Sequence, residues 1–196
     1  MRKVIILILI FTSLRVLASC CKKEGYNFRW SKFNLTNLDH STDNPIPLSG
    51  NTININKYGI RLIFDNERVA RIPNLGFNES YAFDCEALFR NRDTITSIDV
   101  ITRQNFDNTH PAGSSVIQYM QARPTRFDKY YPVYEYNPVS QALPYINDDQ
   151  VSTIHNNGID FRFQKASPNL GQYRFVVTVS FKNGRTLSDS TEILFN

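Results

Sequence analysis

The sequence predicts an all-β fold in which two sheets pack face to face as a sandwich. Short segments in which apolar and polar residues alternate recur along the chain, as expected for strands with one buried face. Turn-forming residues separate these segments at intervals of roughly 8–15 residues. Aromatic residues make up 13% of the chain and supply large side chains for a core between two sheets. A β-barrel is the alternative arrangement for the same strands.

The first strand is predicted to begin near Tyr26. Apolar and polar residues alternate over residues 26–30 and again over residues 33–36. The slip at Ser31 and Lys32 predicts either a β-bulge within one long strand or two short strands. Residues 39–50 are predicted to form a loop because they are rich in turn-forming residues. The same kind of alternation predicts further strands at residues 53–55, 59–65, 81–85 and 94–102.

The C-terminal part of the chain predicts three more strands, at residues 158–164, 170–181 and 185–195. Asn183-Gly184 separates the last two and predicts a two-residue type I′ hairpin turn. At the start of the penultimate strand, Gly171-Gln172-Tyr173 resembles the tyrosine corner of immunoglobulin-like sandwiches. That resemblance implies an immunoglobulin-like β-sandwich.

One short helix is predicted over residues 114–122, where Ser114 is a suitable N-cap residue. Residues 123–150 are predicted to form a long Tyr/Pro-rich loop, because four prolines disfavour a central strand or a long helix. Exposed tyrosines on a stiff loop could stack on a glycan or contact an envelope protein. The candidate ligand-binding residues are therefore Tyr130, Tyr131, Tyr134, Tyr136 and Tyr145. The alternative is that this loop covers an open face of the sandwich and its tyrosines cap the core.

The N-terminal segment has the pattern of a secretory signal, in which Arg2 and Lys3 precede a short apolar run. The run is too short for a transmembrane helix, which needs about 20 apolar residues. Leu17-Ala18-Ser19-Cys20 resembles the lipobox of bacterial lipoproteins. The resemblance implies cleavage before Cys20, diacylglycerol on its thiol and an acyl chain on its new amine. An ordinary cleaved signal is disfavoured, because Leu17 stands where such a signal needs a small residue.

This resemblance defines the expected organisation of the chain. Residues 1–19 are the expected lipoprotein signal peptide, residues 20–25 a lipidated tether, and residues 26–196 a single β-sandwich domain. The lipid on Cys20 is the expected contact with the membrane.

The charge balance gives no reason to expect nucleic acid as a partner. The full chain has 22 basic and 18 acidic residues. Arg2, Lys3 and Arg15 lie in the predicted signal, which leaves 19 basic against 18 acidic residues and a net charge of +1. A near-neutral chain with no Lys/Arg cluster in its sequence beyond Lys22-Lys23 therefore gives no electrostatic reason to expect nucleic acid.

Two cysteines remain once Cys20 carries lipid. Cys21 and Cys85 could form a disulfide in an oxidising compartment, which would close a loop of 64 residues. Such a bridge would contribute about 4 kcal/mol through loop entropy. The alternative is a buried free thiol at Cys85, with Cys21 unpaired in the tether.

The sequence predicts no catalytic, metal or cofactor site. Asp107, His110, Ser114 and Ser115 are close together in the chain, but local serines beside a loop histidine usually serve as turn and capping groups. The three histidines lack metal-ligand spacing, and phosphate-binding loops are absent. Two carboxylates brought together by folding remain an open alternative, because their distance depends on the fold.

The layout also resembles a group of small Bacteroidetes lipoproteins known only by a domain of unknown function. The shared features are Cys20-Cys21-Lys22, the segment of residues 81–85, and the motif His110-Pro111-Ala112-Gly113-Ser114. The acidic export tag that follows the cysteine in surface lipoproteins of that group is missing. The resemblance therefore implies the outer membrane, on its periplasmic face rather than the cell surface.

Three functions follow from these observations. We expect a lipid-anchored, non-enzymatic binding module of the cell envelope. A small envelope hydrolase that uses paired carboxylates is the alternative from another class. A purely structural subunit, whose exposed edge strand pairs with a neighbour, is the third.

Overall fold

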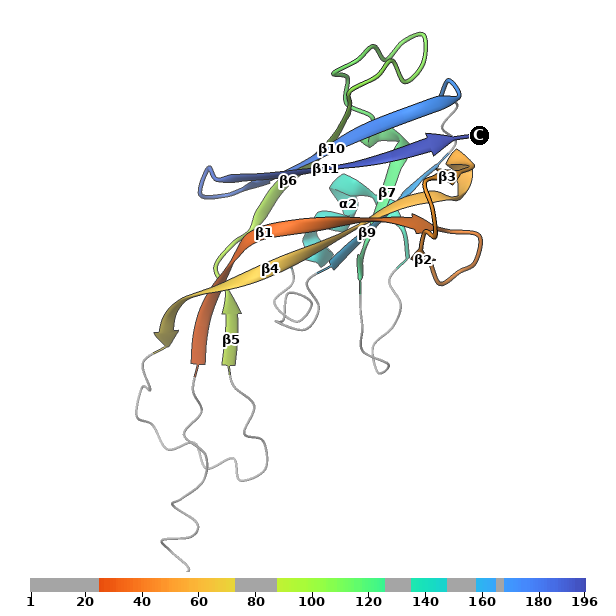
Figure 1. Cartoon of the computed structure of the whole chain (residues 1–196). Helices are drawn as coiled ribbons and strands as arrows, with labels where there is room; N and C mark the ends of the chain where they lie inside the picture. The colour runs from red at the N-terminus through yellow and green to blue at the C-terminus, as the bar shows by residue number, and fades with distance from the viewer. Residues whose placement is uncertain (1–24, 73–87, 126–134, 148–157, 165–167) are drawn as a thin grey trace, which may run out of the picture.

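The computed structural model describes residues 25–72, 88–125, 135–147, 158–164 and 168–196. Within these ranges the chain forms two β-sheets that face each other, which confirms the predicted all-β, sandwich-like fold (Figure 1). The larger sheet has the strand order β2-β1-β4-β9-β7-β8, with β5 parallel to the start of β1. Its strands are β1 (Gly25–Asp39), β2 (Ile46–Pro47), β4 (Tyr58–Ile72), β5 (Leu88–Asn91), β7 (Met120–Thr125), β8 (Asn137–Pro138) and β9 (Gly158–Phe163).

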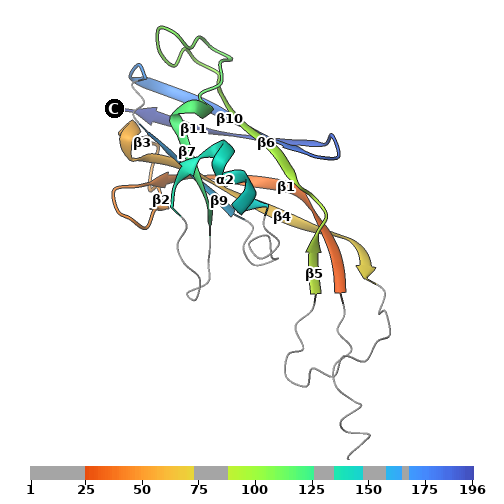
Figure 2. The same cartoon turned by 180° about the vertical axis from the view of Figure 1, so that it is seen from behind.

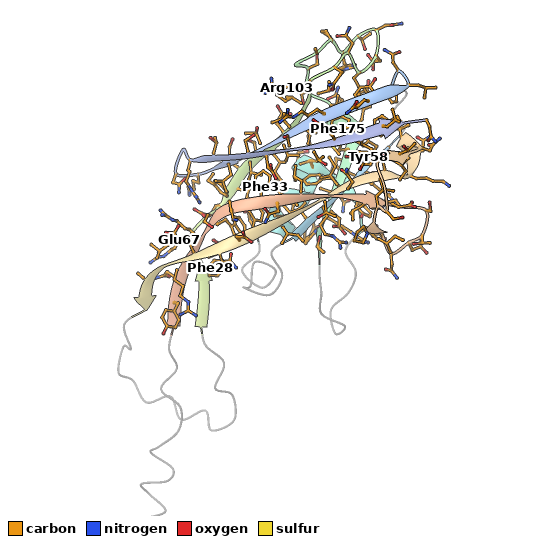
Figure 3. The ribbon with its side chains drawn as sticks, viewed as in Figure 1. Phe28, Phe33, Tyr58, Glu67, Arg103 and Phe175 are labelled. Carbon is orange, nitrogen blue, oxygen red and sulfur yellow. The ribbon has the colours of Figure 1, made fainter. Side chains whose placement is uncertain are left out.

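The smaller sheet has the strand order β3-β11-β10-β6. Its strands are β3 (Thr52–Ile53), β6 (Ile95–Thr102), β10 (Gly171–Phe181) and β11 (Thr186–Phe195). Two 3₁₀ turns, η1 (Ile55–Lys57) and η2 (Ile117–Tyr119), precede β4 and β7. Aromatic side chains fill the space between the sheets. Tyr58 from the larger sheet stacks on Phe175 from the smaller one, with ring centroids 6.0 Å apart (Figure 3).

The first strand is bent where the sequence predicts a bulge. The register between β1 and β4 shifts between Trp30 and Lys32, and again between Asn27 and Phe28. The first of these shifts confirms the bulge expected at Ser31 and Lys32. On the N-terminal side of this bulge, β1 pairs with the end of β4 and with β5. These three segments extend together away from the rest of the two sheets (Figure 1).

The C-terminal hairpin is present, but its turn differs from the expected one. Phe181 pairs with Arg185, and the Gly184 N–H donates to the Phe181 carbonyl at 2.9 Å. The loop therefore has three residues, with Gly184 at a φ of +82°. A three-residue loop ends on a left-handed residue that forms a bulge, and glycine takes that position without strain. The prediction of a two-residue type I′ turn was wrong.

The helix also lies elsewhere than expected. Residues 117–119 form only a 3₁₀ turn, and Met120 then begins β7, because Met120, Ala122 and Pro124 alternate into the core. The α-helix α2 (Val139–Ile146) instead lies in the segment predicted to be a Tyr/Pro-rich loop. It packs against β7 and β6, as the view from behind shows (Figure 2).

Two prolines misled the prediction for this segment. Pro144 is tolerated in α2 because the helix is only two turns long and keeps a buried face of Val139, Ala142 and Ile146. Pro124 is tolerated in β7 because β8 pairs only with Gln121 and Ala122. Beyond Ala122, β9 is the one described neighbour of β7, and an edge position accepts a residue without an N–H.

Tyr173 makes the contact expected of a tyrosine corner. Its side chain is buried, and its hydroxyl donates to the carbonyl of Asn169, four residues upstream, at 2.8 Å. The same oxygen lies 3.1 Å from the carbonyl of Asn105, in the loop after β6. This hydroxyl therefore fixes the start of β10 to a second loop at the same end of the sandwich.

Candidate functional site

Three neighbouring strands carry charged residues on the face of the larger sheet that is turned away from the core. Apolar residues of one parity on β4, β9 and β7, such as Ile60, Phe161 and Ala122, belong to the core. The residues between them point to the opposite face, because side chains alternate along a strand. The register places Asp160 between Arg61 on one neighbouring strand and Arg123 on the other.

Six residues on this face are termed the outer-face cluster. They are His40, Arg61, Arg123, Tyr136, Asp160 and Arg162. Arg61, Asp160, Arg123 and Arg162 come from the sheet itself, whereas His40 follows β1 and Tyr136 precedes β8.

Asp160 is the buried centre of the cluster. Only 1% of its side chain is exposed. Its carboxylate accepts hydrogen bonds from Arg61, at 2.6 Å from Nε and 2.9 Å from Nη2, and from the Thr125 hydroxyl at 2.8 Å. The carboxylate raises the pKa of Arg61 through these bonds. Arg123 reaches the carboxylate only at 3.8 Å, so the close contacts of Asp160 are already taken.

Arg162 lies two residues after Asp160 on β9 and on the same face of the sheet. Its Nε and Nη2 donate to the side-chain oxygen of Gln121, at 3.0 and 2.8 Å. Among the residues that the structure describes, no carboxylate forms an ion pair with Arg162.

Tyr136 brings Arg123 and Arg162 together. The guanidinium carbon of Arg123 lies 4.4 Å from the centroid of the Tyr136 ring, and that of Arg162 lies 4.3 Å from it. Both contacts are cation–π interactions. The aromatic ring therefore holds two positive groups within contact distance of one side chain.

The His40 ring packs against Gly59, which has no side chain. A Cβ atom on Gly59 would overlap both the His40 ring and the Phe161 carbonyl oxygen, so only glycine fits at that position. The imidazole then lies edge-on to Tyr136, with ring centroids 5.6 Å apart. The backbone N–H of His40 donates to the Lys57 carbonyl at 2.7 Å, and this bond fixes the loop after β1.

Two buried polar atoms of the cluster lack a hydrogen bond. They are the Tyr136 hydroxyl and Nε2 of His40, for which no partner with hydrogen-bond geometry exists in the described part of the chain. Burial raises the pKa of Tyr136. Burial also lowers the pKa of His40 to about 4, and nearby Arg123 and Arg162 lower it further, while Asp160 acts in the opposite direction. Both groups are therefore neutral at pH 7.

The cluster offers groups that suit the recognition of a ligand. Its positive and aromatic groups can bind a ligand through charge-assisted hydrogen bonds and stacking. None of its six residues is a serine, threonine or cysteine, and its one hydroxyl belongs to Tyr136, whose pKa is raised.

The local set of Asp107, His110, Ser114 and Ser115 forms a turn. The Asp107 carboxylate accepts from the Thr109 and His110 backbone N–H groups at 2.7 and 2.8 Å and contacts His110 Nδ1 at 2.8 Å. His110 Nε2 lies 2.9 Å from the Gln118 side-chain amide. The Ser115 hydroxyl instead donates to Asp99. Both ring nitrogens of His110 thus have partners other than a serine.

A hollow of about 500 Å³ lies on the outer face of the smaller sheet. It is lined by Arg103, Gln104, Gln172, Tyr173, Arg174, Val176 and Glu192. Its polar side chains largely pair with one another, because Glu192 contacts Arg174 at 3.9 Å and Gln172 at 3.4 Å. This hollow therefore presents fewer unsatisfied groups than the outer-face cluster.

Of the predicted site residues, Tyr136 alone belongs to the outer-face cluster. Tyr145 lies on α2 with half of its surface exposed. Cys20, Cys21, Cys85, Tyr130, Tyr131 and Tyr134 lie outside the described residues, and so does any bridge between Cys21 and Cys85.

The described residues include neither a cluster of metal ligands nor a membrane-spanning helix. The described residues contain no group of three histidine, cysteine, aspartate or glutamate side chains that could hold a metal ion. No helix within them is long and apolar enough to cross a bilayer.

The sequence prediction missed the charged residues of the cluster. The alternation of Ile159, Phe161 and Phe163 predicts β9, but the opposite parity, Asp160 and Arg162, has the pattern of an ordinary solvent-facing set. The useful signal was Arg61, a charged residue between two apolar ones in another strand. Pairing β4 with β9 brings these charges together, and sequence alone does not specify that pairing.

Comparison with known proteins gives a family and no function. A search of curated proteins finds no match to this chain. A family model described as "Domain of unknown function (DUF5034)" matches residues 30–192, which include every residue of the outer-face cluster. The chain therefore belongs to the DUF5034 family.

Proposed function

We propose that this protein is a lipid-anchored binding module of the bacterial cell envelope, that it has no catalytic activity, and that its ligand binds at the outer-face cluster. The anchor part of the proposal is supported by the lipobox-like Leu17-Ala18-Ser19-Cys20. The first strand begins at Gly25, only five residues after Cys20. A lipid on Cys20 would hold the folded domain close to the membrane surface.

The proposal also includes a location. The motifs shared with small Bacteroidetes lipoproteins support the outer membrane. The residues after Cys20, Cys21-Lys22-Lys23-Glu24-Gly25, lack an acidic tag, which supports the periplasmic face.

One observation carries the binding part of the proposal, namely the contact of Arg123 and Arg162 with the same tyrosine ring. Arg61 and Thr125 already satisfy Asp160, so this carboxylate does not account for a second and a third arginine beside it. Only 12% of the Arg123 side chain is exposed. Holding partly desolvated cations together costs free energy, and proteins accept that cost at sites of recognition.

Metabolic labelling tests the anchor. Cells that express the full-length chain are grown with a clickable palmitate analogue, and the labelled protein is followed in the membrane fraction. We expect labelling of the wild type and none of Cys20→Ala, whereas Cys21→Ala keeps the label as the matched control. Equal labelling of wild type and Cys20→Ala, or none of either, contradicts the anchor.

Native mass spectrometry tests binding. The full-length protein is extracted from its own membranes in a mild detergent, and any retained small ligand is weighed. We expect a ligand on the wild type and on Arg174→Gln, a change on the other sheet, but not on Arg162→Gln. Equal retention by both variants, or no retained mass on the wild type, contradicts binding at the cluster.

A further inference from the structure

The charges of the outer-face cluster do not balance within the described residues. Asp160 pairs with Arg61 at hydrogen-bond distance, whereas Arg123 contacts the same carboxylate only at 3.8 Å and Arg162 forms an ion pair with no described carboxylate. His40 adds no compensating charge. A cluster of this kind favours a negatively charged partner, because like charges held together repel each other in a site of low polarity.

Arg162, Arg123 and Tyr136 also have hydrogen-bond donors that no described residue uses. Arg162 uses two of its nitrogens on one Gln121 oxygen, and a guanidinium has five N–H donors. The side chain of Arg123 makes no hydrogen bond among the described residues and contacts Asp160 only at 3.8 Å. The buried Tyr136 hydroxyl has no partner within the same ranges. Buried polar groups in proteins are almost always satisfied, so these donors call for an acceptor.

The guanidinium groups of Arg123 and Arg162 lie close enough to each other to share one small anion. Both guanidinium carbons lie within 4.4 Å of the Tyr136 ring centroid. They can therefore be no farther apart than the sum of the two ring distances. One carboxylate or phosphate group has enough oxygens to accept hydrogen bonds from two neighbouring guanidinium groups. Arginine is the side chain best suited to such bidentate recognition.

We propose that the outer-face cluster binds an oxyanion, a carboxylate or phosphate group of the ligand, between Arg123 and Arg162 beside the Tyr136 hydroxyl. This inference rests on the proposed binding function and names the chemical class of the ligand. Asp160 is hydrogen-bonded to Arg61 and lies 3.8 Å from Arg123, so the ligand is assigned to the side chains of Arg123 and Arg162.

Titration calorimetry on the full-length protein in detergent tests the proposal with two probes at constant ionic strength. Inorganic phosphate represents a phosphoryl group, and succinate represents a carboxylate. We expect saturable binding of at least one probe. Saturation by phosphate alone assigns a phosphoryl ligand, and saturation by succinate alone assigns a carboxylate ligand.

Substitutions show whether the probe binds at the outer-face cluster. We expect Arg162→Gln to weaken the affinity at least about tenfold, the loss typical of one charge-assisted contact. Arg174→Gln removes the same charge from the other sheet and should leave the affinity unchanged. Tyr136→Phe removes only the hydroxyl and should weaken binding less than Arg162→Gln. Arg162→Lys keeps the charge but loses the fork, so a folded Lys variant with weakened binding supports the proposal even where the Gln variant unfolds.

The outcomes separate this inference from the proposed function. If neither probe saturates, or if Arg174→Gln weakens binding as much as Arg162→Gln, the oxyanion proposal is wrong. If native mass spectrometry still shows a ligand that depends on Arg162, the binding function survives and only the ligand class is overturned. If that ligand is also absent, both fail.

Discussion

Arg61 and Asp160 form a side-on ion pair across β4 and β9, with Nε 2.6 Å and Nη2 2.9 Å from the two carboxylate oxygens. The carboxylate is almost fully buried, whereas 16% of the Arg61 side chain is exposed. Thr125 on β7 donates to the same carboxylate at 2.8 Å. One side chain thus joins three neighbouring strands on the outer face of the larger sheet.

We expect Asp160→Asn to destabilise the fold by about 3 kcal/mol, because removing one partner of a buried ion pair leaves the other charge uncompensated. Three arginines would then lie close together without a carboxylate from β9. The free energy of unfolding in urea, measured for the full-length protein in detergent, checks this expectation.

Asp65→Asn is the matched control for that substitution. Asp65 pairs with Lys32 at 3.2 Å on an exposed part of the sheet. Exposed ion pairs contribute little, so its loss should cost less than about 1 kcal/mol. Equal effects of the two substitutions would show that the Asp160 network contributes no more than a surface pair.

A second prediction concerns the tyrosine that connects two loops. Tyr173→Phe removes the hydroxyl that bonds to Asn169 and contacts Asn105, and leaves both carbonyl groups with one partner fewer. We expect a loss of about 1–2 kcal/mol in urea unfolding.

Tyr119→Phe provides the control for this loss. The Tyr119 ring stacks on Phe106 at 5.7 Å, but its hydroxyl makes no hydrogen bond among the described residues. Removing that hydroxyl should change the free energy of unfolding by no more than about 0.5 kcal/mol. A Tyr173 variant as stable as the Tyr119 variant argues against the corner as a stabilising contact.

The strands could be predicted from the sequence because each has one buried face. The outer-face cluster could not be predicted, because it depends on which strands pair. Apolar alternation predicts β6, β9, β10 and β11, since one parity of each strand is turned to the core, as Phe161 is on β9 and Val177 on β10. The helix was missed because Pro144 and Tyr145 outweighed the apolar spacing of Val139, Ala142 and Ile146. The outer-face cluster joins residues from 40 to 162, and the distance between them is fixed only by the strand order β4-β9-β7.

A third prediction concerns the glycine beneath His40. In Gly59→Ala the new Cβ would overlap the His40 ring and the Phe161 carbonyl oxygen. The flexible ring could shift, but the backbone oxygen belongs to the neighbouring strand β9 and cannot move without disturbing the sheet. We expect a loss of about 2–3 kcal/mol in urea unfolding, the usual cost of overpacking.

Two variants separate the causes of that loss. Gly113→Ala changes a glycine with φ +89° whose Cβ would meet nothing, so it measures backbone strain alone, about 1 kcal/mol; Gly59 has no positive φ, so its larger loss is assigned to overlap. His40→Ala combined with Gly59→Ala should recover only part of the stability, because the Phe161 carbonyl remains. Full recovery would assign the whole effect to the imidazole.

The last prediction is a pH dependence of folding that arises from His40. The folded protein keeps this imidazole neutral down to about pH 4, because burial disfavours its charged form. In the unfolded chain the same group takes up a proton near pH 6.5. Between these two values the unfolded state binds more protons than the folded state. Stability should therefore fall as the pH is lowered from 6.5 towards 4.

Carboxylates also titrate in the lower part of that window, so His40 has to be isolated by difference. We expect the urea midpoint of the wild type to fall more between pH 7 and pH 5 than that of His40→Gln, which has no proton to take up at this position. Two-dimensional NMR of the His40 ring gives a direct reading, with a titration midpoint near pH 4 as the expected result. A midpoint near 6.5 would mean that the ring is solvated in the folded protein, and the close packing of His40 between Gly59 and Tyr136 would then be wrong.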